Sequence, residues 1–259
     1  MCSRDRAGRS SISSRRRTAA VAFRPPCRPE RLPGPRPSPL RPRCGSPSML
    51  QYLVRHGQSV SNVEERVQGQ EDVALSELGR RQAQEVAAWA GRVHAASPIA
   101  EIWSSPLCRA RDTAAAIATR IARPLQIEDD LCELHAGVFQ GHLWADLEVL
   151  FPAAVARWQS GDVTYRIPGG ESRADLAARG RVMLEKLAGR DVPSMVVVAH
   201  GGILTAALGS LLGPDHPVLA SAAMRPFTKL PALDNASVTV LEWPGPVLHR
   251  FNDTDHLGG

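Results

Sequence analysis

The sequence predicts an α/β protein, a three-layer α/β/α sandwich with a largely parallel central sheet. From Met49 onward, short apolar runs alternate with longer stretches whose apolar residues recur at helical spacing. Strands that alternate with helices are typical of parallel sheets covered by helices on both faces. Two of the apolar runs end in a histidine followed by glycine, at His56 and His200. Because ligands of such sheets bind at the carboxyl ends of the strands, we expect the functional site there.

Five short segments have the composition of strands. The run at 195–199 contains three consecutive valines, and the run at 50–54 leads into a tight turn at Arg55-His56-Gly57. Further strands are expected at residues 102–104, 237–241 and 247–251.

Capping residues and stop signals predict four helices between these strands. Ser172 and Asp175 have the spacing of a capping box, in which each residue caps the other's backbone. The helix that follows His200-Gly201-Gly202 is apolar over almost its whole length and ends at Gly213. Helices are therefore expected after Ser76, after Ser105-Pro106 with the proline at the first helical position, after Ser172 and after His200.

The charge of the chain is divided unevenly along its length. The whole chain has a formal net charge of +5, but residues 1–48 hold twelve arginines and only two acidic residues. Residues 49–259 therefore sum to −5. The first segment also carries nine prolines and few large apolar residues, so burial cannot offset the entropy cost of ordering it. We expect residues 1–48 to be a disordered extension and residues 49–259 to form the folded domain.

Three interpretations of residues 1–48 stay open. Met49 lies directly before the first strand, so translation that starts there would leave the segment unmade. An arginine- and serine-rich, acid-poor start is also typical of an organellar transit peptide. The third alternative is a solvated basic tail that contacts nucleic acid or anionic lipid. A cytoplasmic location is the default expectation, with organellar targeting as its alternative.

Composition and spacing argue against several classes of protein. No run of about 18 apolar residues occurs, so we expect no membrane span. The mildly acidic body lacks the basic face of a nucleic-acid-binding domain, so no nucleic-acid partner is expected for it. The five cysteines form no CxxC pair, and HxH and HExxH spacings are missing. We therefore expect neither a metal ion nor another cofactor.

The two strand-end histidines indicate phosphate chemistry. LVRHGQS places Arg55 and His56 at the end of the first strand, and VVVAHGG places His200 directly before a helix. A helix N-terminus and a guanidinium group both favour the oxygens of a phosphate. The pattern describes a phosphate site in which one imidazole can act as nucleophile.

These two motifs belong to a set of six that resembles the histidine phosphatase superfamily, in its phosphoglycerate-mutase-like branch. The resemblance extends from about residue 50 to residue 241, nearly the whole body of the chain. In order, the motifs are LVRHGQS, RVQGQED with LSELGRRQAQ, SSPLCRARDTA, LCELHAGVFQG, IPGGES and VVVAHGG.

The resemblance implies a role for each motif residue. His56, Glu133 and His200 would form the catalytic set. His56 would take the phosphoryl group as a phosphohistidine, and Glu133 would first protonate the leaving oxygen and then activate water. Gln68 would reach the substrate. The phosphate oxygens would be held by Arg55, Asn62, Arg109, His200 and Gly201.

The segment 141–170 favours a phosphatase over a mutase. Mutases of this family carry extra basic residues after the loop that corresponds to the one with Glu133. Here the segment holds only Arg157 and Arg166 as cations and is rich in large apolar residues. We therefore expect a metal-independent phosphomonoesterase that hydrolyses small phosphorylated metabolites. One alternative is a mutase-type phosphoryl transferase. The other is a non-catalytic binder of phosphorylated ligands, and the intact set of His56, Glu133 and His200 argues against this second alternative. A homodimer is an open alternative to a monomer.

Overall fold

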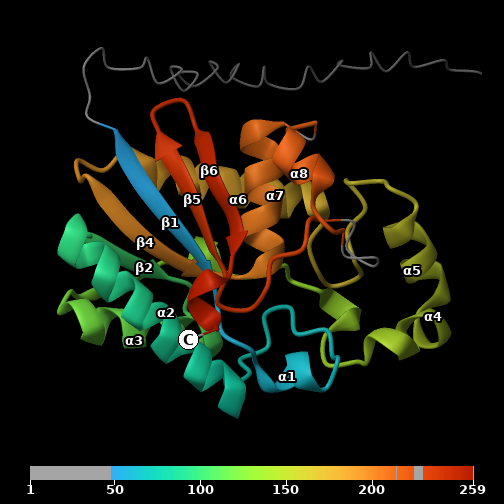
Figure 1. Cartoon of the computed structure of the whole chain (residues 1–259). Coiled ribbons are helices and arrows are strands. Elements are labelled where there is room, and N and C mark those ends of the chain that lie inside the picture. Colours follow the sequence, from blue (N-terminus) through green and yellow to red (C-terminus); the bar gives the residue numbers. More distant parts are fainter. Residues whose placement is uncertain (1–47, 214, 225–229, 259) are drawn as a thin grey trace, which may run out of the picture. The chain divides into compact units, whose positions relative to one another are not determined.

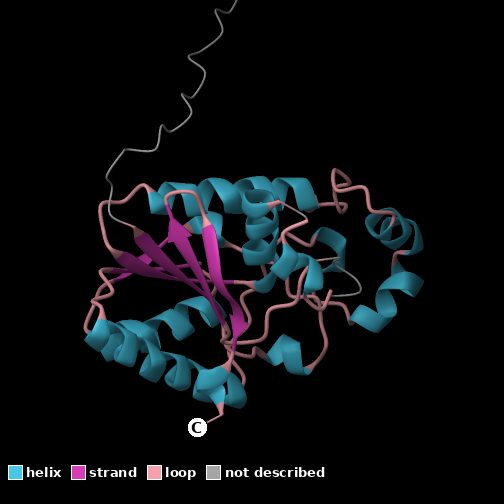
Figure 2. Cartoon of the chain, turned by 45° about the horizontal axis from the view of Figure 1, so that its top comes forward, coloured by secondary structure: helices cyan, strands magenta, loops and turns pink. Residues whose placement is uncertain are grey.

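The computed structural model describes residues 48–213, 215–224 and 230–258. The expectation of disorder for the N-terminal extension therefore lies outside the described residues, except at Ser48. The described residues form a six-stranded mixed sheet with helices on both faces (Figures 1 and 2). This arrangement confirms the predicted α/β sandwich.

The sheet is parallel in four of its strands and antiparallel at one edge. β1 pairs with β4 in parallel and with β5 in antiparallel orientation. β2 lies parallel to both β3 and β4, and β6 pairs antiparallel with β5. Across the sheet the order is β3 (Leu125–Ile127), β2 (Glu101–Ser104), β4 (Ser194–Ala199), β1 (Met49–Arg55), β5 (Val238–Trp243) and β6 (Val247–Asp253).

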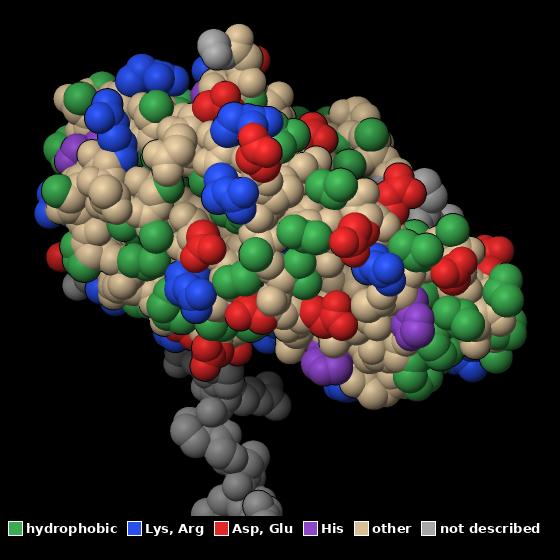
Figure 3. Space-filling model, turned by 90° about the horizontal axis from the view of Figure 1, so that it is seen from below, with side chains coloured by type: hydrophobic (Ala, Val, Ile, Leu, Met, Phe, Trp, Pro, Cys, Tyr) green, Lys and Arg blue, Asp and Glu red, His purple; other side chains and the backbone are tan. Residues whose placement is uncertain are grey.

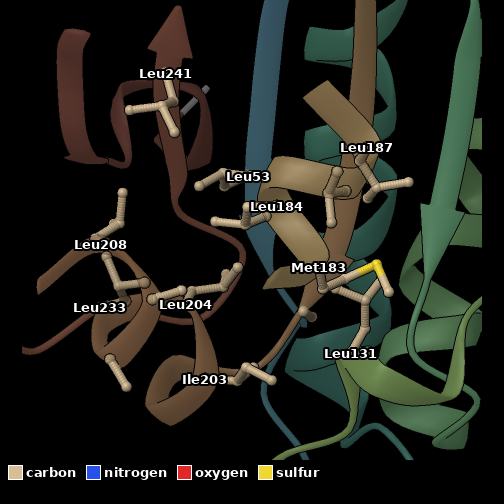
Figure 4. Packing of buried hydrophobic residues seen from close by; sticks show 14 of the residues in the cluster. Leu53, Leu131, Met183, Leu184, Leu187, Ile203, Leu204, Leu208, Leu233 and Leu241 are labelled. Atoms are coloured by element: carbon tan, nitrogen blue, oxygen red, sulfur yellow. The ribbon is translucent and has the colours of Figure 1, made fainter. Parts of the chain in front are cut away.

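The central strands are apolar throughout because both of their faces are buried. Along β4, Val196 and Val198 pack in the cluster that includes α2 (Glu77–Ala96) and α3 (Cys108–Ile121). Met195 and Val197 pack on the opposite face, against α6 (Arg173–Ala188) and α7 (Gly201–Leu212). Figure 4 shows this second cluster, with Leu53 of β1 beside leucines of α6 and α7.

The described residues also form four shorter helices. They are α1 (Val60–Val63), α4 (Leu147–Leu150), α5 (Pro152–Gln159) and α8 (Pro217–Ser221). Of these, α8 packs its Leu219 into the cluster of α6 and α7. The segment that carries α4 and α5 has a small core of its own around Trp158, Phe139 and Leu147. None of the described helices is both long enough and apolar enough to cross a membrane.

Two local expectations differ from the structure. α3 begins at Cys108, two residues after the expected proline, and its N-cap Leu107 makes no side-chain cap. The hydroxyl of Ser105 lies 2.8 Å from Nε2 of His200 and accepts from the backbone N–H of Leu107 at 3.3 Å. This serine therefore contacts another strand end and the N-cap residue, and it does not cap the first turn of the helix. The three-residue strand β3 was not expected, because so short a segment carries no periodic signal.

The loop after β1 packs against the N-terminus of α2. Ser76, the N-cap of α2, donates its backbone N–H to the carbonyl of Gln58 at 2.8 Å. A Cβ at Gly79 would lie 1.9 Å from the same carbonyl oxygen, and a Cβ at Gly57 would lie 2.5 Å from the carbonyl oxygen of Gly79. These glycines let two backbone segments approach directly behind His56.

We expect Gly79→Ala to destabilise the fold, because its methyl group meets backbone that cannot rotate away. Overpacking of this kind costs about 1–3 kcal/mol in the free energy of unfolding. Gly209→Ala is the matched control within a helix, since nothing lies within 4 Å of the added Cβ. There the gain in helix propensity should stabilise the protein by about 0.5–1 kcal/mol. Denaturant unfolding measures both changes, and equal effects of the two variants would contradict the packing described here.

Candidate active site

The site begins where β1 and β4 end side by side. Arg55, the last residue of β1, is opposite Ala199, the last residue of β4, and the backbone N–H of His56 donates to Ala199 O at 3.0 Å. The residues that follow the two strands, His56 and His200, therefore become neighbours. Their ring centroids lie 5.1 Å apart, and both side chains are buried.

One ring nitrogen of His56 is oriented by its own turn. Nδ1 lies 2.7 Å from the carbonyl oxygen of Gly57. Because a carbonyl oxygen only accepts, Nδ1 carries the proton and donates, which leaves the lone pair on Nε2. The amide of Asn235 donates to His56 O at 3.1 Å and to Oδ1 of Asn62 at 3.2 Å, so it ties two predicted site residues together.

His200 is fully buried behind His56. Its Nε2 lies 2.8 Å from the hydroxyl of Ser105, whereas its Nδ1 has no hydrogen-bond partner in the described part of the chain. Burial lowers the pKa of His200 well below its usual value, and the positive charge of Arg109 adds to this effect. The imidazole is therefore neutral near pH 7.

Two buried arginines are held by backbone carbonyl groups. Arg55 donates to Leu233 O, and Arg109 donates to Glu71 O at 2.7 Å and to Gly69 O at 2.8 Å. Burial lowers the pKa of Arg109, while the nearby carboxylate of Glu133 acts in the opposite direction. Carbonyl groups orient a guanidinium without carrying a full negative charge.

The carboxylate of Glu133 lies at the N-terminus of α7. It accepts hydrogen bonds from the backbone N–H groups of Gly202 at 2.8 Å, Ile203 at 3.0 Å and Leu134 at 2.9 Å. A helix N-terminus leaves such donors without partners inside the helix, so a carboxylate is a suitable ligand for them. A Cβ at Gly202 would lie 2.4 Å from Oε1 of Glu133, which explains why the second glycine of HGG lacks a side chain.

One cavity brings the predicted residues together. It encloses about 780 Å³ of empty space, including its mouth toward solvent. Its wall includes every residue that the sequence analysis singled out except His200, which is buried beside His56. These residues are Arg55, His56, Asn62, Gln68, Arg109, Glu133 and Gly201.

The cavity also contains residues that the sequence analysis missed. Arg66 and Arg173 line it, together with Trp144 and Trp158. The guanidinium of Arg173 lies 3.8 Å from the ring centroid of Trp158 and donates to the backbone carbonyl of the same residue at 2.9 Å. An arginine at the first residue of a helix opposes the helix dipole, and this is the sequence signal that marks Arg173.

The two cations expected in the covering segment lie elsewhere. Arg157 pairs with Asp162 at 3.3 Å and Arg166 pairs with Asp175 at 2.8 Å, and neither arginine lines the cavity. Within the described ranges, no group of three or more His, Cys, Asp or Glu side chains is placed to hold a metal ion.

Comparison with known proteins identifies the family. The model of the histidine phosphatase superfamily, branch 1, matches residues 51–254. The chain belongs to the histidine phosphatase superfamily. Its fold is that of the phosphoglycerate-mutase-like phosphatases, so the predicted family, fold and enzyme class are confirmed.

Two curated relatives and one solved structure illustrate the similarity. Glucosyl-3-phosphoglycerate phosphatase of Mycobacterium tuberculosis H37Rv is 40% identical over 169 residues, which are 62% of this chain and 74% of that protein. A metal-independent phosphoserine phosphatase of Arabidopsis thaliana is 40% identical over 157 residues, 60% of this chain and 65% of that protein. The structure of mycobacterial glucosyl-3-phosphoglycerate phosphatase with VO3 has a TM-score of 0.66 at 35% identity and covers 79% of this chain and 99% of that one.

We expect His200 to make the stability of this histidine phosphatase depend on pH. Because its pKa is lower in the folded than in the unfolded protein, the unfolded state binds more protons in acid. The free energy of unfolding should therefore be unaffected above about pH 6.5 and fall below it. His200→Gln should remove up to about 1.4 kcal/mol per pH unit of that slope. Denaturant unfolding between pH 5 and 8 measures the difference; His256, whose pKa burial also lowers, is present in both proteins. Parallel curves for the two proteins would contradict the buried, neutral state of His200.

Proposed function

We propose that the protein hydrolyses phosphomonoesters of small metabolites through a phosphohistidine on Nε2 of His56, without a metal ion. The observation that carries this proposal is the shared cavity. In it a histidine with its lone pair on Nε2 lies among two buried arginines, a helix N-terminus and a carboxylate. Phosphoryl transfer needs positioning and charge stabilisation more than it needs further covalent chemistry, and these groups supply both.

In the first step, Nε2 of His56 attacks the phosphorus with its lone pair, and the bond from phosphorus to the ester oxygen breaks. Arg55, Arg109 and the amide of Asn62 bind the phosphate oxygens. Nδ1 of buried His200 has no hydrogen-bond partner among the described residues, so we assign it a hydrogen bond to the substrate. Glu133, when protonated, gives its proton to the departing alcohol.

In the second step, the same carboxylate receives a proton from water while the water oxygen attacks the phosphohistidine. The bond between Nε2 and phosphorus breaks, inorganic phosphate leaves, and His56 regains its lone pair. The imidazole is the nucleophile in the first displacement and the leaving group in the second, so one difficult step is divided into two easier ones.

The distribution of charge favours hydrolysis over mutase activity. The cover over the cavity contributes apolar side chains such as Trp144 and Trp158, while its two arginines pair with aspartates elsewhere. A mutase has to hold a doubly phosphorylated intermediate and reorient it, and the cover of residues 141–170 places no cation in the cavity wall for this task.

We expect steady release of inorganic phosphate from small phosphomonoesters in the presence of EDTA. With 3-phosphoglycerate and a catalytic amount of diphosphoglycerate, isomerisation should be slow compared with this hydrolysis. Malachite-green detection of phosphate and a coupled isomerisation assay measure the two rates. Isomerisation that outpaces hydrolysis would establish the mutase alternative instead.

The second pair of arginines supports a narrower substrate class. Arg66 and Arg173 line the cavity but come from different elements than the proposed phosphate ligands. The relatives are named for glucosyl-3-phosphoglycerate and for phosphoserine, and each of these molecules carries a carboxylate beside its phosphate. We infer that the substrate is a phosphorylated small organic acid whose carboxylate binds at Arg173.

Substitution of Arg173 tests this substrate class. In Arg173→Met, kcat/KM should fall about 10- to 100-fold for phosphoserine and 3-phosphoglycerate, the usual value of a hydrogen bond to a charged group. For glycerol phosphate, which lacks the carboxylate, it should fall less than about threefold. Arg166→Met, an arginine outside the cavity, is the control. Equal losses on both kinds of ester would show that Arg173 supports the wall rather than the acid group.

The remaining partner assignments stay predictions. On the face shown in Figure 3, basic and acidic side chains are interspersed rather than gathered by sign, which suits a small-molecule enzyme better than a nucleic-acid binder. The cytoplasmic location and the homodimer remain proposals that rest on the sequence.

A further inference from the structure

The segment that carries Glu133 has no regular structure of its own. Residues 132–136 lie between two single-turn 3₁₀ helices, Asp129–Leu131 and Gly137–Phe139. A general acid acts only when its oxygen is within hydrogen-bond reach of the leaving group, and displacement by about 1 Å costs much of its effect. Some other element must therefore hold this backbone.

Arg179 of α6 reaches the backbone of this segment with both Nη atoms of its guanidinium. Nη1 donates to Asp130 O at 2.8 Å and to Cys132 O at 2.7 Å, and Nη2 donates to Glu133 O at 3.3 Å. Nε and Nη2 also contact the carboxylate of Glu171, at 3.2 and 3.0 Å. One side chain thus binds three carbonyl groups before and at the proposed acid.

Glu171 binds the segment on the other side of Glu133. Its Oε2 accepts from the backbone N–H of His135 at 2.9 Å, and its own N–H donates to His135 O at 2.9 Å. The side chains of Arg179 and Glu171 are only 18% and 21% exposed, so solvent competes weakly for these contacts. The ion pair therefore fixes the chain immediately before and after the acid.

The carboxylate of Glu133 is held from a second direction by the N-terminus of α7. α7 packs against α6, the helix that carries Arg179. The backbone of Glu133 is thus held by a side chain of α6 and its carboxylate by the N-terminus of α7. Because these two helices pack together, they fix the position from which Glu133 can deliver its proton.

We propose that Arg179, oriented by Glu171, is a positioning residue that acts through Glu133. This inference rests on the proposed function, in which Glu133 is the general acid. A lysine could not replace Arg179, because one ammonium group cannot reach three carbonyl oxygens and a carboxylate in this planar arrangement. Neither residue lines the cavity, so we assign the pair to the position of the acid rather than to the binding of the substrate.

The test compares esters that differ in their need for an acid. The parameter is kcat/KM, which reports steps up to release of the alcohol and so excludes hydrolysis of the phosphohistidine. Glycerol phosphate has a poor leaving group and 4-nitrophenyl phosphate a good one. In Glu133→Gln the ratio of kcat/KM for glycerol phosphate to kcat/KM for 4-nitrophenyl phosphate should fall about 10²- to 10⁴-fold. Arg179→Gln and Arg179→Lys should each lower the same ratio at least about tenfold.

The matched control is Arg181→Gln on the same helix. Arg181 pairs with Glu185 at 2.9 Å on the surface and has no described hydrogen bond to residues 132–136. The ratio of kcat/KM for the two esters should therefore not change. Thermal unfolding of each variant identifies loss of fold; if Arg179→Gln does not fold, Arg179→Lys and Glu171→Gln carry the test. The double variant Glu133→Gln with Arg179→Gln should have the same ratio as Glu133→Gln alone, because the second change acts through a group already removed.

Two results would overturn the inference. Equal losses on both esters in the folded Arg179 variants would indicate a general structural role, and an additive double variant would show that Arg179 acts independently of Glu133. A Glu133→Gln variant with an unchanged ratio would instead refute the proposed acid, a result distinguishable from failure of the positioning pair.

Discussion

The parallel pairing of β1 with β4 is the constraint on which the rest of the site depends. The register places Arg55 opposite Ala199, so the strands end together and the next residue of each is a histidine. Side chains alternate between the faces of a sheet, and a slip of one residue would turn the core residues of a strand to the opposite face. Because helices cover both faces of β1 and β4, the buried valines and leucines fix this register. The energy that places the two imidazoles together thus comes from the hydrophobic core.

Around this centre the protein buries two cationic side chains, Arg55 and Arg109. Arg55 and Arg109 are held by carbonyl groups, and burial together with these cations keeps His200 neutral. Buried cations are stabilised by an anionic partner. In the proposed reaction the phosphate dianion of the substrate is such a partner. The carboxylate of Glu133, which lies at the N-terminus of α7, is a negatively charged neighbour of Arg109 within the protein itself.

The sequence was most informative where local pattern and tertiary role agree. The strands that precede His56 and His200 were predictable because an apolar run followed by His-Gly is a strong local signal. β3 was not, since three residues next to a proline carry no periodicity, and the start of α3 was placed two residues early because Ser105 bonds to His200 instead of capping. Asn235 and Arg179 could not be found in the same way, and the position of Arg173 at the start of a helix does not reveal its contact with Trp158. Each acts on residues that are distant in the chain, across contacts that only the folded structure creates.

In the proposed reaction, the hydrogen bond from Nδ1 of His56 to Gly57 O directs phosphorylation to Nε2. Rapid quenching of the enzyme with a phosphomonoester in alkaline denaturant preserves acid-labile phosphohistidine, and ³¹P NMR with tandem mass spectrometry identifies the residue and the nitrogen. The account predicts phosphate on Nε2 of His56 alone, and none on His56→Ala. Phosphate on Nδ1, on His200, or on the His56→Ala protein in equal amount would contradict it.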